Sequence, residues 1–324
     1  MLLALAVLLA SCANHPPCPK PVDERPPNRI SGHFMAAKGT ELPYCAWPAT
    51  PPRHPRAVVI LVNGLDTVSR DYADLAEELV RHGYAVYSPE RRTGIYDPVV
   101  KRRGCAPEHW HDWVEDLQLF TAYVRTRHPG VPYFYHTHSL GSLIGIDATK
   151  EALQSGRDVP SGLIVQSPAL PLMIEKKHPF LRGFLNVLTG WHRVAHLRLD
   201  PFDKIYPPGD IQRNCVWEWS EDRVRKGYKG HFFLVAAELG HQARLSASDL
   251  TLPVLAIGGE KDAIVTLKGR LQDEYVTFMH DELHGKPKQV VFLPEGYHNL
   301  TAPPTKKQTL RAIVTWLDAQ GRRY

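Results

Sequence analysis

Three side chains that could together hydrolyse an acyl bond stand far apart in this sequence of 324 residues. Ser139, Asp262 and His298 each follow closely on a short apolar run that is typical of a buried strand. A serine hydroxyl is a weak nucleophile until an imidazole accepts its proton and a carboxylate holds that imidazole. The three residue types and their placement therefore predict a nucleophilic serine, a histidine base and an orienting aspartate.

The serine is expected at the tip of a strand–turn–helix. The sequence His136-Thr137-His138-Ser139-Leu140-Gly141 joins a predicted strand to a predicted helix. A tight turn at this point lifts the hydroxyl above the sheet, at the positive end of the helix. The usual form of the turn is G-x-S-x-G, in which Gly141 matches the second glycine and Thr137 replaces the first. A serine that only caps an ordinary helix is the alternative interpretation.

Donors for the developing negative charge are expected in the backbone. A carbonyl oxygen that gains charge is stabilised by N–H groups that are already in place. The loop 62–66 follows the first strong apolar strand, and Gly64 lets the chain turn sharply there. We therefore expect the oxyanion hole to consist of the N–H groups of Leu65 and Leu140.

The elements that must position these residues alternate between strand and helix. Strands separated by helices imply right-handed crossovers and a mainly parallel sheet, whose ligand site lies at the carboxyl ends of the strands. The apolar patterns predict strands at 57–62, 84–88, 133–136, 163–166, 253–257 and 289–293, and helices at 72–82, 113–127, 141–153 and 309–319.

One interval breaks this alternation. Roughly eighty residues between 167 and 252 contain no clear core strand, far more than the usual connection of about 2–6 residues. Helical patterns near 180–196 and 230–245 favour a folded insertion. We expect a helical cap over the site at about 168–250, within a domain that spans 56–324.

The segments 63–72, 136–141, 258–265 and 296–298 together resemble the monoacylglycerol lipase/lysophospholipase branch of the α/β hydrolases. The resemblance covers the chain from residue 57 onward, and the order serine, aspartate, histidine is the order of that superfamily. It implies an α/β-hydrolase fold, with a mainly parallel sheet flanked by helices and a cap after the sixth strand.

The same resemblance implies a serine esterase. Ser139 would be the nucleophile, His298 the base and Asp262 the orienting acid, with no metal or organic cofactor. The chain departs from the family at three places: Asn63 replaces a histidine, Thr137 replaces a glycine, and 88–94 lacks the usual Asp-x-x-Gly-x-Gly run. Two of these departures lie beside the predicted site, so they concern substrate and rate more than fold.

The first residues form a targeting signal. Residues 1–10 are an uninterrupted apolar run, about half of what a membrane-spanning helix needs. The following Ser11-Cys12 step resembles the lipobox of bacterial lipoproteins, with an ordinary signal peptide as the alternative. This resemblance implies removal of 1–11, lipidation of Cys12 and anchoring in the bacterial cell envelope. Ala13 in place of aspartate points to the outer membrane, facing the periplasm.

A proline-rich segment follows the predicted anchor. Eleven prolines fall between Pro16 and Pro55, which favours extended chain over helix. We interpret 12–55 as a tether or N-terminal extension, to which residues 30–44 can add a β-hairpin with Gly39 at its turn.

The composition limits which kinds of molecule the protein is expected to bind. The 39 basic and 34 acidic residues give a net charge of only +5, which argues against nucleic acid and would tolerate an anionic lipid surface. Four further cysteines allow two disulfides in three pairings, and none has the C-x-x-C spacing of a thiolate metal site. These are Cys18, Cys45, Cys105 and Cys215. His109 and His111 have the spacing of ligands, but we interpret them as solvated or capping residues.

The sequence therefore predicts a lipid-anchored serine hydrolase that cleaves carboxylic esters of lipids through an acyl-enzyme. A cap of the expected length favours single-chain or short-chain substrates. Three alternatives are left open by the residues alone: a thioesterase, a peptidase with the same three side chains, and a lipoprotein binding module that keeps the fold without turnover.

Overall fold

The computed structural model of the chain describes residues 29–49, 54–65, 67–92, 107–173, 198–199, 228–267 and 269–321. The predicted signal peptide, Cys12 and the helix expected at 180–196 lie outside these residues and stay predictions. Within the described ranges, no helix is both long enough and apolar enough to cross a bilayer.

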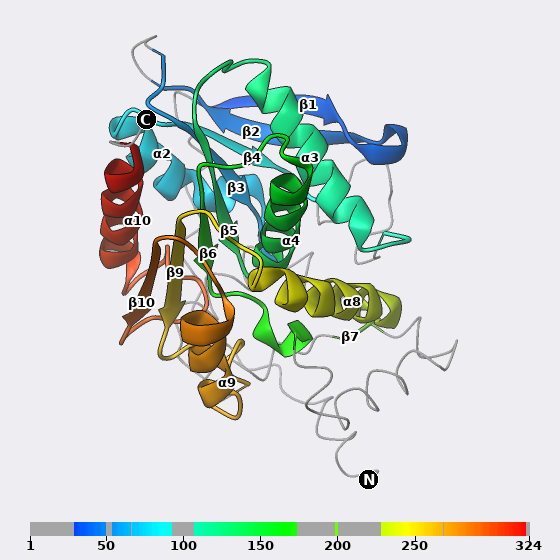
Figure 1. Cartoon of the computed structure of the whole chain (residues 1–324), viewed down its shortest axis with the longest axis vertical. Coiled ribbons are helices and arrows are strands. Elements are labelled where there is room, and N and C mark those ends of the chain that lie inside the picture. Colours follow the sequence, from blue (N-terminus) through cyan, green and yellow to red (C-terminus); the bar gives the residue numbers. More distant parts are fainter. Residues whose placement is uncertain are drawn as a thin grey trace, which may run out of the picture.

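Eight strands form a single twisted sheet in the order β1-β2-β4-β3-β5-β6-β9-β10 (Figure 1). The strands from β4 to β10 are parallel, whereas β1 and β2 form an antiparallel hairpin that joins the edge at β4. Their bounds are β1 (Ile30–Met35), β2 (Glu41–Trp47), β3 (Val58–Val62), β4 (Ala85–Pro89), β5 (Tyr133–His138), β6 (Gly162–Gln166), β9 (Val254–Gly259) and β10 (Lys288–Leu293). All six strands expected from the apolar runs are present, with small shifts at their ends.

The β1–β2 hairpin changes the interpretation of the N-terminal extension. The hairpin expected at 30–44 is present, but its strands belong to the main sheet, so the tether assigned to 12–55 is too long at its carboxyl end. Pro43 fits in β2 because the pairing between β2 and β4 covers only Tyr44 to Trp47. Pro43 lies just outside this pairing, so the N–H that proline lacks is not needed there. The many prolines around the hairpin hid its place in the sheet.

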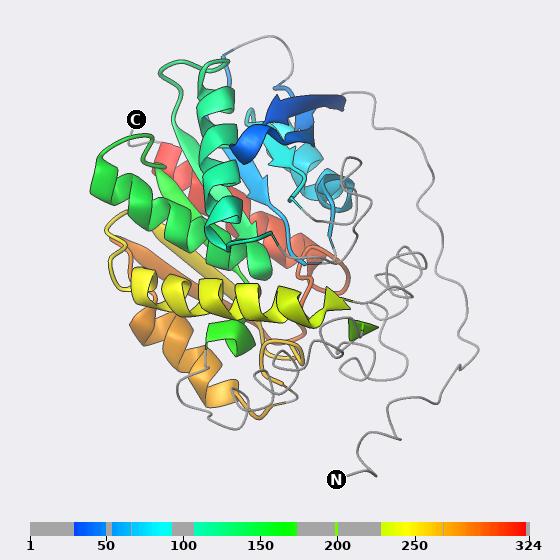
Figure 2. The same cartoon turned by 90° about the vertical axis from the view of Figure 1, so that its right-hand side faces the viewer.

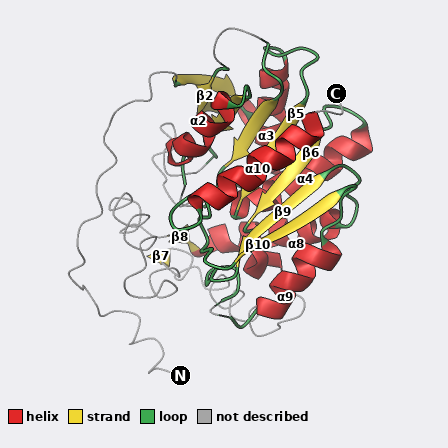
Figure 3. Cartoon of the chain, turned by 90° about the vertical axis from the view of Figure 1, so that its left-hand side faces the viewer, coloured by secondary structure: helices red, strands yellow, loops and turns green. Residues whose placement is uncertain are grey.

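Helices cover both faces of the sheet. On one face, α2 and α10 pack their apolar sides against the sheet, and Figure 3 shows this face toward the viewer. The buried side chains include Leu75 and Leu79 of α2 and Ile313 and Trp316 of α10. The other face carries α3, α4, α8 and α9, seen in Figure 2. The helices are α2 (Ala73–Arg81), α3 (His111–Arg125), α4 (Leu140–Ser155), α8 (Gly230–Ala247), α9 (Gln272–Thr277) and α10 (Lys306–Gly321).

Helix α8 corrects the carboxyl end of the predicted cap. A helix was expected near 230–245 as part of the cap, and α8 occupies this position, but it packs along α4 within the helix layer. Its Gly240 packs so closely against the short 3-10 helix Leu170–Met173, which follows β6, that a Cβ would lie 2.3 Å from the carbonyl oxygen of Leu172. The reason is topological, since the crossover from β6 to the parallel β9 needs a helix on this face.

The carboxyl ends of the parallel strands meet at one edge. The elbow after β5, the loop after β3 and the loops after β9 and β10 all leave the sheet there. The residues predicted to do chemistry therefore come from neighbouring loops, although as many as 159 positions separate Ser139 from His298. A two-stranded ribbon, β7 (Arg198–Leu199) with β8 (Tyr228–Lys229), precedes α8.

Candidate active site

Ser139 occupies a sharp turn between β5 and α4. Its backbone has φ 54° and ψ −120°, a region that residues with a Cβ seldom adopt and that costs of order 1–3 kcal/mol. The turn is held on both sides: the N–H of Ser139 donates to the carbonyl of Gln166 at 3.0 Å, and its own carbonyl accepts from Ser142 at 3.0 Å. This is the geometry of an elbow that presents a hydroxyl, which distinguishes Ser139 from a simple helix cap.

Gly141 lets the helix begin against the end of β3. A Cβ on Gly141 would lie 2.3 Å from the carbonyl oxygen of Val62 and 2.7 Å from that of Asn63. Both contacts are with backbone atoms, which cannot move without displacing the loop that follows β3. The second glycine of the turn is therefore required by packing.

Thr137 fits where the related turn has glycine because a glycine faces it. The side chain of Thr137 is fully buried, and its hydroxyl donates to the carbonyl of Ile164 at 2.7 Å. Its methyl group points at Gly145, where a Cβ would lie only 2.4 Å away. The space that glycine at 137 would leave empty is filled by the threonine, and Gly145 on α4 gives it room.

We predict that Gly145→Ala destabilises the fold, because the new Cβ would collide with the methyl group of Thr137. Alanine normally favours a helix over glycine, but here overpacking should lower the free energy of unfolding by about 1–3 kcal/mol. Thr137→Ser removes the methyl group and keeps the hydroxyl, so the double variant should recover most of that loss. Urea unfolding of the two single variants and the double variant measures the coupling.

Additive effects of Thr137→Ser and Gly145→Ala would contradict this explanation. Gly141→Ala provides the contrast, because its Cβ meets backbone oxygens and serine at 137 should give no recovery.

The three predicted side chains form one hydrogen-bonded chain. Nε2 of His298 lies 2.9 Å from Oγ of Ser139, and Nδ1 of the same ring lies 2.9 Å from Oδ2 of Asp262. Asp262 is fully buried, while 6% of Ser139 and 8% of His298 are exposed. Because an ionised carboxylate only accepts hydrogen bonds, Nδ1 carries the hydrogen and Nε2 presents its lone pair to the serine.

Backbone groups fix the carboxylate. Oδ1 of Asp262 accepts the N–H groups of Ile264 at 3.1 Å and of Val265 at 3.0 Å. Oδ2 is left to face His298. Each oxygen therefore has a defined partner, which sets both the rotamer of the aspartate and the tautomer of the histidine.

A second histidine, His138, connects the hydrogen-bonded residues Ser139, His298 and Asp262 to the loop after β3. Nε2 of His138 lies 3.1 Å from the backbone carbonyl of His298, so it donates there, and Nδ1 is left to accept the hydroxyl of Tyr72 at 2.8 Å. The oxygen of Tyr72 in turn accepts the N–H of Gly64 at 3.3 Å. Sequence reasoning did not assign Tyr72 a role. It lies in the quoted segment 63–72, but no spacing rule connects it with a histidine 66 positions later.

His138 keeps a neutral ring beside His298. Burial lowers the pKa of His138 well below its ordinary value, and the neighbouring His298 ring lowers it further. The ring centroids are 4.9 Å apart, so a positive charge on His138 would oppose the imidazolium that a base at 298 must form. A neutral His138 avoids this repulsion and still donates a hydrogen bond to the backbone of His298.

The two expected oxyanion donors belong to segments that meet at the serine. Leu140 is the first residue of α4, where backbone N–H groups have no partner inside the helix. Gly64, next to Leu65, is close to the elbow: a Cβ there would lie 3.2 Å from Cβ of Ser139. The structure thus brings both loops to the serine, and the roles of Leu65 and Leu140 stay predictions.

Asn63, the replacement for the family histidine, faces away from this chemistry. Its amide nitrogen donates to the carbonyl of Pro89 at 3.1 Å, and its oxygen accepts the hydroxyl of Ser88 at 3.0 Å. Asn63 is buried, and it ties the loop after β3 to the end of β4. This departure changes how the loop is anchored.

One of the two histidines with ligand-like spacing has a partner of its own. His111 lies 3.1 Å from the carboxylate of Glu151, and Asp112 pairs with Lys38. In the part of the chain that the structure describes, no three His, Cys, Asp or Glu side chains gather to hold a metal. Cys45 on β2 is unbonded, and the other three cysteines lie outside the described residues, so the disulfide pairing stays untested.

Comparison with known sequences gives two matches over most of the chain. The sequence profile of the family described as serine aminopeptidase S33 matches residues 53–304. A monoacylglycerol lipase of Mycolicibacterium smegmatis is 24% identical over 304 residues, which cover 89% of this chain and 97% of that protein.

Solved structures share the same architecture. A monoacylglycerol lipase of Paleococcus ferrophilus superposes with a TM-score of 0.63 at 24% identity, covering 87% of this chain and 100% of that chain. A soluble variant of monoglyceride lipase from Saccharomyces cerevisiae, in complex with a substrate analog, gives a TM-score of 0.73 at 16% identity, covering 94% and 99%. At these identities the superpositions establish a common fold.

Proposed function

The chain belongs to the serine aminopeptidase S33 family of α/β hydrolases and is a serine hydrolase, and from that premise we propose that it cleaves carboxylic esters of lipids through an acyl-enzyme. The observation that carries the proposal is the chain of two 2.9 Å contacts from Ser139 through His298 to Asp262. The curated relative named monoacylglycerol lipase supports the ester class.

The reaction follows from the tautomer of His298. Nε2 takes the proton of the Ser139 hydroxyl as the oxygen attacks the ester carbonyl. The carbonyl oxygen becomes negative beside the N–H groups of Leu65 and Leu140, which stabilise it. Collapse of the tetrahedral intermediate transfers the proton from His298 to the leaving alcohol, and the acyl group stays on Ser139.

Water completes the cycle by the same route. His298 takes a proton from water, the hydroxide attacks the acyl carbon, and the proton returns to Oγ of Ser139 as the carboxylic acid leaves. Asp262 holds the ring and stabilises the imidazolium in both halves. The proposed substrates are lipids with one acyl chain, and the predicted lipid anchor at Cys12 would keep this activity at a membrane surface.

A substrate panel tests the proposal. Purified protein without residues 1–12 should hydrolyse monoacylglycerols and lysophospholipids faster than acetyl esters, and it should react with a fluorophosphonate. Faster release from aminoacyl anilides would favour the peptidase that the family description suggests. Folded protein that neither turns over esters nor reacts with the fluorophosphonate would favour a binding module.

A further inference from the structure

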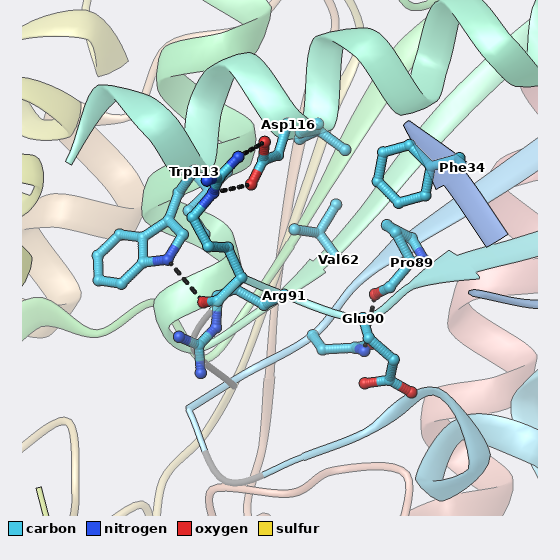
Figure 4. A pocket seen from close by; sticks show the side chains of 11 residues that line it. Phe34, Val62, Pro89, Glu90, Arg91, Trp113 and Asp116 are labelled. Atoms are coloured by element: carbon cyan, nitrogen blue, oxygen red, sulfur yellow. Dashed lines mark hydrogen bonds and ion pairs between the residues drawn. The ribbon is translucent and has the colours of Figure 1, made fainter. Parts of the chain in front are cut away.

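The chain that leaves β4 is clamped before and after Arg91. The carboxylate of Glu90 accepts the N–H of Ser69 at 3.0 Å. Arg92 makes a two-pronged ion pair with Asp116 on α3, with both nitrogen–oxygen distances 2.8 Å (Figure 4). Both partners of this pair are buried, and such bidentate pairs fix geometry strongly. The backbone at 91 is therefore held in one position.

The side chain of Arg91 reaches the loop after β3. Its Nη2 donates to the backbone carbonyl of Leu65 at 2.9 Å. Its guanidinium carbon lies 5.4 Å from the ring centroid of Trp113 and 6.0 Å from that of Phe232. Figure 4 shows the side chain extending past Trp113, on the side away from Asp116.

The aromatic partners are themselves fixed. The indole N–H of Trp113 donates to the carbonyl of Arg92 at 3.1 Å, and the rings of Trp113 and Phe232 lie 5.6 Å apart. Phe232 is buried near the start of α8. A guanidinium that rests on two fixed rings and donates to the Leu65 carbonyl has little freedom to move. A lysine ammonium on its flexible stem would be held less firmly in the same place.

The cavity beside Arg91 does not compete with this interpretation. It has a volume of about 30 Å³ and is lined by Val62, Asn63 and Trp113 among others. A volume of that size has room for only a few water molecules. Among the described residues, Arg91 contacts the Leu65 carbonyl and the rings of Trp113 and Phe232.

We propose that Arg91 is a positioning residue for the oxyanion hole. By holding the carbonyl of Leu65, Arg91 fixes the peptide plane that follows this residue and so restricts the rotation of Leu65 within the loop. The N–H of Leu65 lies in the preceding peptide plane, and the restricted loop keeps it directed at the charge that develops on the substrate oxygen. The guanidinium also adds a positive charge beside that loop. This inference rests on the proposed function, because it concerns a step of the ester hydrolysis.

Arg91→Met tests the role by removing the charge and the donor while keeping an apolar stem. We expect kcat to fall about 10- to 100-fold, below the roughly 10²–10³ that loss of an oxyanion donor itself costs, with KM changed less than about twofold. Arg91→Lys should lie between Arg91→Met and the wild type, since lysine can reach the Leu65 carbonyl but stacks less well.

A boronic acid inhibitor gives a readout that a purely structural role would not move. It forms a tetrahedral anion on the serine, so its Ki should rise with the loss in kcat, while the Ki of a fatty acid product stays constant. Arg127→Met is the matched control: Arg127 is exposed, lies over the ring of Tyr123 and donates to that residue's carbonyl. It should leave all of these constants unchanged.

The outcomes separate the two proposals. Wild-type protein without esterase activity would overturn the proposed function, whatever Arg91 does. Active wild-type protein with an unchanged kcat in Arg91→Met, or with a higher KM and equal boronate affinity, would overturn only the positioning role. If Arg91→Met fails to fold, the comparison of Arg91→Lys with the wild type decides by the same constants.

Discussion

Alanine at position 139 should lower kcat for ester hydrolysis by about 10⁴-fold or more and abolish covalent labelling by a fluorophosphonate. The substitution removes the hydroxyl oxygen that lies 2.9 Å from Nε2 of His298. It should leave the fold intact, because alanine carries the same Cβ as serine and strains the backbone at φ 54° no further. Steady-state kinetics and gel fluorescence of the labelled protein measure both effects.

Ser142→Ala is the matched control for this prediction. Ser142 is a buried serine on the same helix, three residues later, and its hydroxyl donates to the carbonyl of Gln166 at 3.2 Å. It should retain the label and most of the activity. A label that survives in Ser139→Ala, or that disappears in Ser142→Ala alone, would place the nucleophile elsewhere on the chain.

Much of the site could be predicted because its residues follow strands. A run such as Val58–Val62 is buried along its whole length, and only a central strand of a parallel sheet needs so continuous an apolar sequence. Once strands are recognised, the loops at their carboxyl ends must meet. Ser139, Asp262 and His298 each lie on such a loop, so their proximity could be predicted from the sequence.

The supporting contacts could not be predicted in the same way. The hydroxyl of Tyr72 meets His138, and Thr137 meets Gly145, only after helices and strands have packed. Neither pair has a sequence pattern of its own. The sequence therefore shows Thr137 only as a departure from the usual elbow, and the packed structure shows that Gly145 makes room for its methyl group.

The β1–β2 hairpin and α8 show that a sequence pattern can predict an element without predicting where it packs. The sequence predicts β1 and β2 as a local hairpin, but their place in the sheet depends on pairing between β2 and β4, whose partner residues are 39 to 45 positions apart. For α8, the helical pattern was correct and the layer was not, because periodicity identifies a helix without indicating which face of the molecule it covers.

Asp262→Asn should lower kcat by about 10⁴-fold with little change in the fold. In the wild type, Oδ1 accepts two backbone N–H groups and Oδ2 accepts the hydrogen on Nδ1 of His298. An asparagine oxygen that keeps the backbone contacts places its NH₂ group against Nδ1. The ring then moves its hydrogen to Nε2, where it faces Oγ of Ser139 and no lone pair is left to accept the serine proton.

The opposite orientation of the asparagine does not rescue the base. It would restore the acceptor for Nδ1, but it would turn the NH₂ group toward the N–H groups of Ile264 and Val265, leaving buried donors unpaired. Asp147→Asn is the control, since Asp147 is equally buried and accepts the hydroxyl of Ser246 at 2.6 Å, away from His298. It should keep kcat within about threefold, because it changes no group that touches the reacting atoms.

A loss smaller than about tenfold in Asp262→Asn would mean that something else sets the tautomer of His298. His138 cannot supply that control, because its Nε2 donates to the backbone carbonyl of His298 and leaves the ring nitrogens untouched. Among the described residues, the ring nitrogens of His298 form hydrogen bonds with Ser139 and Asp262. The single substitution at 262 therefore decides whether this carboxylate holds the base ready to accept the serine proton.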